Sequence, residues 1–190
     1  MLKIEKVEAV AFRAARRPWH AAFGTVLESE YAVVFVESED GHVGVGEVAT
    51  IWSRKGRAQA RDINEIVAPQ LVGKDALRLN ELCLLVRDAL GREGNPAKAG
   101  VDIALHDLVG KALGLPVHQL LGGKVRDRFR LSHSINMASP EEMAAEAVFL
   151  VERGFRTLKL KAGIDHSNDL RALELIRDAC IHQDTFGPTR

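Results

Sequence analysis

The chain has 190 residues, 46% hydrophobic and 27% charged, a balance typical of a globular protein rather than a disordered one. Lysine plus arginine and aspartate plus glutamate both number 26, so no net charge favours nucleic acid or a membrane surface as partner. No apolar run approaches the roughly 20 residues of a membrane span, and the N-terminal segment lacks the apolar core of a signal peptide. Cys83 and Cys180 lie far apart without metal-type spacing, so we expect reduced thiols and a cytoplasmic protein.

The first part of the chain predicts an antiparallel meander. Strands are expected over residues 2–12, 30–38 and 43–48, with a turn at 39–42. The residues between the first two strands, 13–28, are irregular and predict a long loop, and a second loop follows over residues 47–52. Long loops that carry aromatic residues are often functional. The alternative is a surface loop whose Trp19 and Phe23 fold back on the sheet.

Three amphipathic helices are predicted next, over residues 59–71, 77–90 and 95–113. The third begins at Asn95-Pro96, a favourable helix start, and ends before Gly114. It carries Asp102, His106 and Asp107, but these offsets do not gather all three on one face, so we expect a structural role for His106. Breaks at Leu115-Pro116 and Gly122-Gly123 then predict a domain boundary near residues 123–128.

From residue 130 strands and helices alternate. A short strand over 130–136 precedes Ser139-Pro140-Glu141-Glu142, a capping box that opens a helix ending at Gly154. A strand follows over 156–163, and Ser167 is expected to cap another helix. This βαβα order is typical of the opening of a parallel α/β domain with right-handed crossovers.

The second of these strands contains the sequence Lys159-Leu160-Lys161. Successive strand side chains point to opposite faces, so the two lysines share one face. A parallel strand covered by helices is normally apolar, and two neighbouring ammonium groups disfavour each other's charge. A lysine in that position can act as a base near neutral pH. The alternative is a half-exposed strand whose lysine face is simply solvated.

Four stretches occur in a fixed order along the chain: residues 95–111, Leu115-Pro116, Leu120-Leu121-Gly122-Gly123 and Lys159-Leu160-Lys161. In this order and spacing they resemble the mandelate racemase and muconate lactonizing enzymes of the enolase superfamily, and the resemblance covers residues 1 to about 178. The resemblance implies an α+β capping domain over residues 1–123, an antiparallel meander plus helices. It implies that residues 124–190 are the truncated start of a (β/α) TIM-like barrel, its first two βα units. Leu158 and Leu160 would face the helices, and the lysines the barrel interior.

The function implied by the resemblance is that of an isomerase or lyase acting on a small-molecule carboxylate. Such enzymes abstract the proton alpha to the carboxylate and hold the enediolate with Mg²⁺. The nearest expectation is a muconate cycloisomerase, with mandelate racemase, dipeptide epimerase and o-succinylbenzoate synthase as other members. Lys161 matches the base, and Lys159 matches the lysine that lowers its pKa. Loops 16–25 and 47–52 match those that close over the substrate, and the candidate substrate-binding residues are Trp19, His20, Phe23, Ile51, Trp52, Ser134 and Asn136.

The sequence also departs from the family. The family takes its Mg²⁺ ligands from the ends of the third, fourth and fifth barrel strands, and we expect none of them in this chain. Residues 179–190 make a poor barrel strand, in which Asp184 is the only candidate acid. Two βα units cannot close a barrel, so we expect open apolar faces and a homo-oligomer. The alternative function is a catalytically inactive truncated fragment or an association module.

Overall fold

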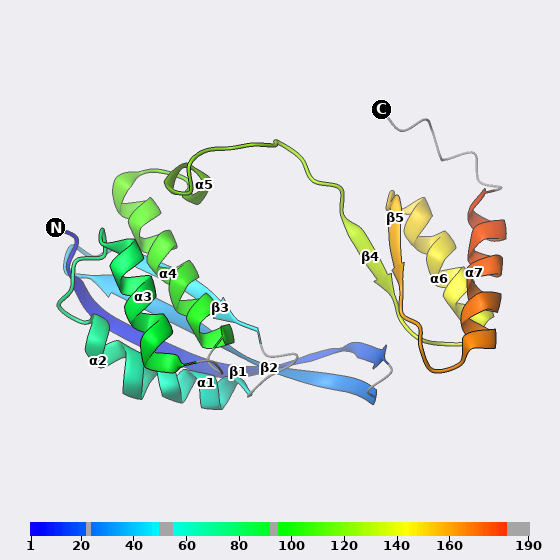
Figure 1. Cartoon of the computed structure of the whole chain (residues 1–190), viewed down its shortest axis with the longest axis horizontal. Helices are drawn as coiled ribbons and strands as arrows, with labels where there is room; N and C mark the ends of the chain where they lie inside the picture. Colours follow the sequence, from blue (N-terminus) through cyan, green and yellow to red (C-terminus); the bar gives the residue numbers. More distant parts are fainter. Residues whose placement is uncertain (22–23, 50–54, 92–94, 182–190) are drawn as a thin grey trace. The chain divides into compact units, whose positions relative to one another are not determined.

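The structure is a computed structural model that describes residues 1–21, 24–49, 55–91 and 95–181 (Figure 1). Contacts divide the chain into two compact units. The first comprises residues 1–15 and 28–125, and the second comprises residues 16–27 and 126–190. None of the described helices is long and apolar enough to cross a membrane.

The first unit contains most of a three-stranded sheet in the order β1-β2-β3, with β1 at Ile4–Ala21, β2 at Gly24–Ser38 and β3 at Val43–Val48. The adjoining ends of β1 and β2, within residues 16–27, belong to the second unit. Strands β2 and β3 are antiparallel, in a register that runs from Ala32 opposite Val48 to Glu37 opposite Val43. The turn between them places Gly41 at a φ of 86°, which glycine adopts without steric cost. The predicted meander is therefore confirmed.

The loop predicted over residues 13–28 is wrong, because β1 and β2 extend through most of it as a two-stranded ribbon. Phe12 stacks on Tyr31 where the extension begins, with ring centroids 5.5 Å apart, and within it the Arg13 guanidinium lies 3.6 Å from the Glu28 carboxylate and 3.5 Å from that of Glu30. Because β1 is an edge strand, Pro18 does not interrupt a ladder on both sides. A ribbon held by such pairs needs no alternating apolar face, so the hydrophobic pattern did not reveal it.

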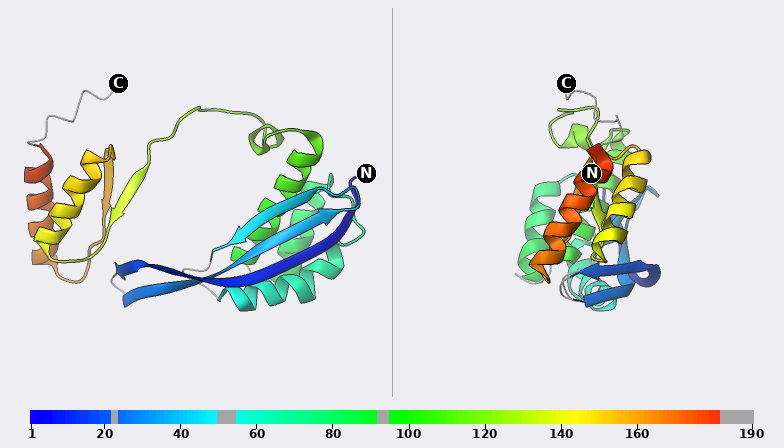
Figure 2. Two further views of the ribbon diagram at one scale, coloured as in Figure 1. Left: turned by 180° about the vertical axis from the view of Figure 1, so that it is seen from behind. Right: turned by 90° about the vertical axis from the view of Figure 1, so that its right-hand side faces the viewer.

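Within the first unit, helices cover one face of this sheet, and no described helix of that unit lies on the other face (Figures 1 and 2). The predicted helix over residues 59–71 is a continuous segment of α1 (Gly56–Asp62), the π-helical turn η1 (Ile63–Val67) and α2 (Ala68–Leu71). Helices α3 (Leu79–Leu90) and α4 (Asn95–Leu113) match their predictions, and the short α5 (Val117–Leu120) follows.

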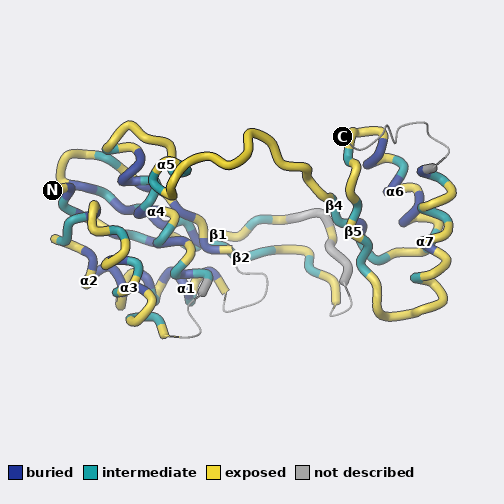
Figure 3. The backbone as a smooth tube through the Cα atoms, turned by 45° about the horizontal axis from the view of Figure 1, so that its top comes forward, coloured by how far each residue is buried: buried dark blue, intermediate teal, exposed yellow. Residues whose placement is uncertain are grey.

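The core of the first unit lies between the sheet and α4, where buried residues alternate along the strands (Figure 3). Helix α4 packs on β3 at unusually short range, because Gly44 and Gly46 face it. A Cβ at Gly46 would lie only 1.9 Å from the Gly100 carbonyl oxygen. The sheet–helix distance is therefore set by glycines rather than by side chains.

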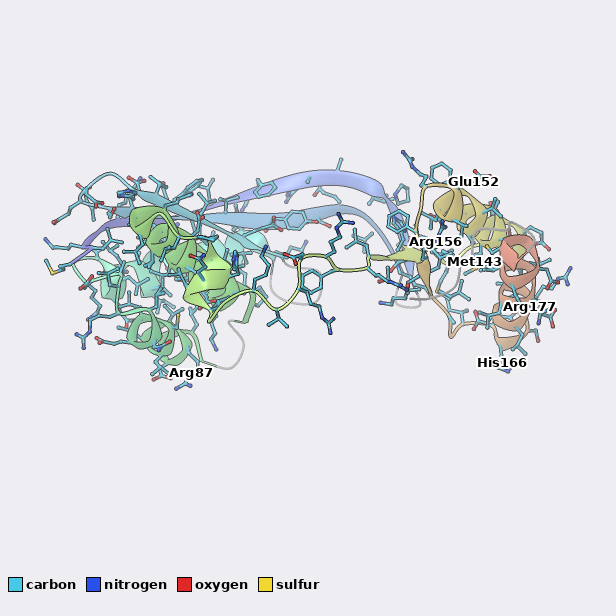
Figure 4. All side chains as sticks on the ribbon, turned by 90° about the horizontal axis from the view of Figure 1, so that it is seen from above. Arg87, Met143, Glu152, Arg156, His166 and Arg177 are labelled. Atoms are coloured by element: carbon cyan, nitrogen blue, oxygen red, sulfur yellow. The ribbon has the colours of Figure 1, made fainter. Side chains whose placement is uncertain are left out.

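The second unit has the predicted βαβα order: β4 (Ser132–Ile135), α6 (Pro140–Glu152), β5 (Thr157–Leu160) and α7 (His166–Ile181). Its two strands pair in parallel, from Ser132 opposite Thr157 to Ile135 opposite Leu160. Its core gathers buried side chains of β4, α6 and α7, among them Met143, which Figure 4 labels.

The starts of the two helices in this unit show one correct prediction and one error. The capping box of α6 is present, with the Ser139 side chain accepting the Glu142 N–H and the Glu142 carboxylate accepting the Ser139 N–H. At α7 the predicted cap Ser167 is wrong. The Asp165 carboxylate, on the residue immediately before α7, accepts the backbone N–H groups of Ser167 (2.9 Å) and Asn168 (3.1 Å), which have no partner within the helix.

Candidate functional site

Four of the residues predicted from the sequence come together at the C-terminal ends of β4 and β5. Ser134 is the register partner of Lys159, and the Lys161 ammonium donates to the Asn136 side-chain oxygen over 3.2 Å. Ligands of parallel α/β folds bind beyond the carboxyl ends of strands, where these residues lie. The four residues Ser134, Asn136, Lys159 and Lys161 are called the lysine site below.

Strand alternation explains why these polar groups share a face. Ile135 is buried against α6 and α7, and Leu158 and Leu160 pack against the same apolar cluster, as predicted. The residues between them must then point away from the helices. On that side Lys159 is exposed and Lys161 is half-buried.

Two carboxylates hold the backbone on either side of the site. The Asn136 N–H donates to Glu146 of α6 over 3.4 Å, and the Gly163 N–H donates to Asp169 of α7 over 2.8 Å. Gly163 has a φ of 112°, a conformation that strongly favours glycine. Sequence reasoning missed both acids, because each reaches the site from a helix and neither belongs to a recognisable motif. They fix where the chain bearing Asn136 and Lys161 leaves each strand.

Before β5, Arg156 fixes the chain in a similar way. Its guanidinium donates to the Val151 carbonyl at the end of α6 over 3.3 Å, and Figure 4 labels both it and the neighbouring Glu152. The strand that carries the lysines is therefore tied to helices at its start and just after its end.

The other predicted substrate-binding residues are placed less completely. Trp19 and His20 lie in β1, in a strand rather than in the loop expected for them, and only their backbone is described. Phe23, Ile51 and Trp52 lie outside the described residues. The ribbon tip that carries Trp19 and His20 belongs to the same compact unit as β4 and β5.

The described residues do not fit the Mg²⁺ that the family resemblance implies. Mg²⁺ prefers an octahedron of oxygen ligands. Among the described residues the one group of three potential metal ligands is Cys83, Asp102 and His106, which belongs to the first unit and includes a thiol and an imidazole. Asp184 lies outside the described residues. No step of the chemistry at the lysine site is therefore assigned to a metal here.

The chemistry available at the lysine site is that of two amines beside an amide and a hydroxyl. An amine that has lost its proton can remove one from carbon, and a neighbouring ammonium can stabilise the negative charge that develops. The Asn136 oxygen is an acceptor that holds Lys161 in one direction. This combination suits proton transfer to and from an anionic substrate.

The chain is similar to one family model and to several known enzymes. The family model described as "Mandelate racemase / muconate lactonizing enzyme, N-terminal domain" matches residues 4–122. A chloromuconate cycloisomerase of Pseudomonas putida is 34% identical over 184 residues, covering 92% of this chain and 49% of the relative. An N-succinyl-L-Arg/Lys racemase of Bacillus cereus is 28% identical over 182 residues, covering 93% of this chain and 49% of the relative.

Solved structures give the same result. The muconate lactonizing enzyme of Pseudomonas fluorescens, complexed with muconolactone, is 31% identical with a TM-score of 0.86, over 94% of this chain and 50% of that one. The substrate-liganded L-Ala-D/L-Glu epimerase of Bacillus subtilis is 30% identical with a TM-score of 0.87, over 94% and 50%. The chain thus spans about half the length of the relatives it matches.

Proposed function

Since this chain belongs to the mandelate racemase / muconate lactonizing enzyme family, we propose that it carries the base of an isomerase that removes a proton alpha to a carboxylate. Lys161 is the base, and Lys159 is the second cation that assists it. The observation that carries the proposal is the meeting of Lys161, Asn136, Lys159 and Ser134 on one face, at the carboxyl ends of two parallel strands.

Each residue of the lysine site has a distinct part in this proposal. Lys161 in its neutral form takes the proton from the substrate carbon, and Asn136 keeps its amine pointed in one direction. Lys159 lies on the same face two residues earlier, where its charge favours the neutral form of Lys161 and attracts the substrate carboxylate. Ser134, opposite Lys159, supplies a hydroxyl to the same face.

The substrate class is proposed from the relatives as a small carboxylate. Relatives of similar identity include muconate cycloisomerases, an N-succinyl amino acid racemase and dipeptide epimerases, so identity does not single out one of them. All these reactions begin with, or reverse, the loss of a proton beside a carboxylate. Trp19 and His20 on the ribbon tip are proposed to shape specificity, which is supported by the grouping of residues 16–27 with 126–190.

A relative that holds Mg²⁺ provides the comparison for whether the 190-residue chain can bind the ion by itself. A dipeptide epimerase of Enterococcus faecalis is described as complexed with Mg and a dipeptide. Because the described residues offer no such oxygen cluster, we propose that the 190-residue chain alone neither binds Mg²⁺ tightly nor turns over substrate, and that it associates into a homo-oligomer. Phe149, Leu170 and Leu173 on its helices are about half exposed and are available for that association.

The experiment that tests the proposal is an exchange assay in D₂O with Mg²⁺, followed by proton NMR. Residues 1–190 would be joined to the C-terminal half of the Pseudomonas putida chloromuconate cycloisomerase, and the assay would offer muconolactone, N-succinyl-L-arginine and L-Ala-L-Glu. The expected result is loss of the α-proton signal from at least one compound. A folded hybrid that binds Mg²⁺ yet exchanges none of them would contradict the proposal. The 190-residue chain alone serves as the inactive control.

A further inference from the structure

A second cluster of chemically reactive side chains lies in the first unit, between helices α3 and α4. Cys83 comes from α3, while Asp102 and His106 come from α4 and are one helical turn apart. One ligand atom from each of the three lies within 4.8 Å of the others. The Cys83 sulfur is 2.9 Å from an Asp102 carboxylate oxygen, and His106 Nδ1 is 3.6 Å from the same oxygen.

These separations are close to those of a metal coordination shell. Zn²⁺ binds sulfur at about 2.3 Å and imidazole nitrogen or carboxylate oxygen at about 2.0 Å, so tetrahedral ligand atoms lie about 3.3–3.6 Å apart. The His106–Asp102 separation of 3.6 Å lies in this range, and the 2.9 Å hydrogen bond between Cys83 and Asp102 would lengthen toward it when an ion replaces the thiol proton. Thiolate, carboxylate and neutral imidazole are the ligand types that Zn²⁺ selects, and together they balance its two positive charges.

The surroundings hold the donors and leave room for an ion. Neighbouring residues on the same helices, among them Leu82 and Leu105, are buried in the core and fix the positions of α3 and α4. His106 Nδ1 also lies 2.9 Å from the Asp102 backbone carbonyl, which keeps the ring beside Asp102; an ion bound through Nδ1 would replace this contact.

Solvent can reach the cluster of Cys83, Asp102 and His106. The Asp102 side chain is 50% exposed, and His106 is 18% exposed. A cavity of about 230 Å³ borders Cys83 and Asp102, which is room for a water as fourth ligand. The ammonium of Lys98, which also lines this cavity, is engaged by the Gly91 carbonyl.

We propose that Cys83, Asp102 and His106 form a site for a zinc-class divalent ion that links α3 to α4 in the first unit. The site is separate from the lysine site, and its ligands do not suit Mg²⁺. Because the donors come from two helices, a bound ion would stabilise the packing of these helices on the sheet.

The test uses Co²⁺, whose spectrum reports thiolate ligation, added to the reduced 190-residue chain after chelator treatment. The expected result is one equivalent of bound Co²⁺ with a thiolate-to-cobalt charge-transfer band, which Zn²⁺ removes and Mg²⁺ does not. Cys83→Ser should abolish the band. Cys180→Ser is the matched control, since this second cysteine lies in the core of the other unit, and it should leave the band unchanged.

A second variant keeps the proposal open to refutation if Cys83→Ser fails to fold. His106→Gln removes a partly exposed ligand and should lower Co²⁺ affinity by more than the about 10–100-fold typical of losing an outer-shell partner. No charge-transfer band in the unsubstituted chain, a band that persists in folded Cys83→Ser, or an unchanged affinity in His106→Gln would each overturn the site.

Discussion

Substituting Gly46 by alanine tests the close packing of β3 on α4 that organises the first unit. The added Cβ would lie 1.9 Å from the Gly100 carbonyl oxygen and 2.8 Å from the Ala104 nitrogen, whereas real Cβ contacts essentially never fall below 3.0 Å. Both atoms are helix backbone, so relief requires α4 to move away from β3 by about 1 Å. Such a movement would separate side chains that are fully buried, including Val34 and Leu105.

Two opposing effects determine how much Gly46→Ala changes the free energy of unfolding. Replacing glycine by alanine reduces the entropy of the unfolded chain and stabilises by about 0.4–1 kcal/mol where the site has room. Overpacking a close-packed core costs about 1–3 kcal/mol and more where backbone must shift. We therefore expect Gly46→Ala to lower the free energy of unfolding by about 3 kcal/mol.

Urea denaturation measures the free energy of unfolding, and hydrogen exchange of peptides within residues 95–113 reports the stability of the first unit separately from that of the second. Glu47→Ala is the matched control, because this neighbouring side chain is exposed, and it should change the free energy of unfolding by less than about 0.5 kcal/mol. A loss below about 1 kcal/mol for Gly46→Ala would refute the reasoning that backbone contact sets this packing distance.

Ser139→Ala should cost about 1 kcal/mol by removing the α6 capping box, and exchange of the first α6 amides should quicken; an unchanged rate would count against the cap. Burial, with a lesser effect of the Asp102 carboxylate, raises the pKa of the Cys83 thiol to about 12, so iodoacetamide should modify it much more slowly at pH 8 than free cysteine; equal rates would contradict this. The hydrogen bond from the Leu2 N–H lowers the pKa of the Asp75 carboxyl, so the stabilising contribution of Asp75 is present above about pH 4 and is lost as pH falls further. Asp75→Ala should therefore weaken the dependence of the urea midpoint on acid pH. An unchanged dependence would contradict this contribution of Asp75.

Local signals predicted the helices well. The bounds of α4 match because Asn95-Pro96 marks a favourable start and Gly114 lies immediately beyond the end. The capping box of α6 is equally local, since both partners lie within four residues. The β1–β2 ribbon depends on partners far apart in sequence, such as Arg13 and Glu30, and no local pattern identifies such pairs.

Local sequence likewise predicts only part of the candidate site. Strand alternation alone placed Lys159 and Lys161 on one face, because side chains in a strand repeat every two residues. The contact between Lys161 and Asn136 requires the parallel register of two strands separated by a helix, and only the structure supplies it. Likewise Cys83 and His106 come from different helices, so their spacing in the sequence gives no sign of a shared site.

Exchange of the substrate α-proton tests most directly whether Lys161 is the base and Lys159 assists it. The measurement is α-proton exchange in D₂O by the Mg²⁺-loaded hybrid enzyme, compared among Lys161→Ala, Lys159→Ala and the control Thr157→Ala. Thr157 lies on the same face at the other end of β5. Lys161→Ala should lose on the order of 10²–10⁴ of the exchange rate, Lys159→Ala should retain some exchange with its profile shifted to higher pH, and Thr157→Ala should match the unsubstituted enzyme. Full exchange by folded, Mg²⁺-binding Lys161→Ala would contradict the claim and return the Lys-x-Lys face to a solvated surface.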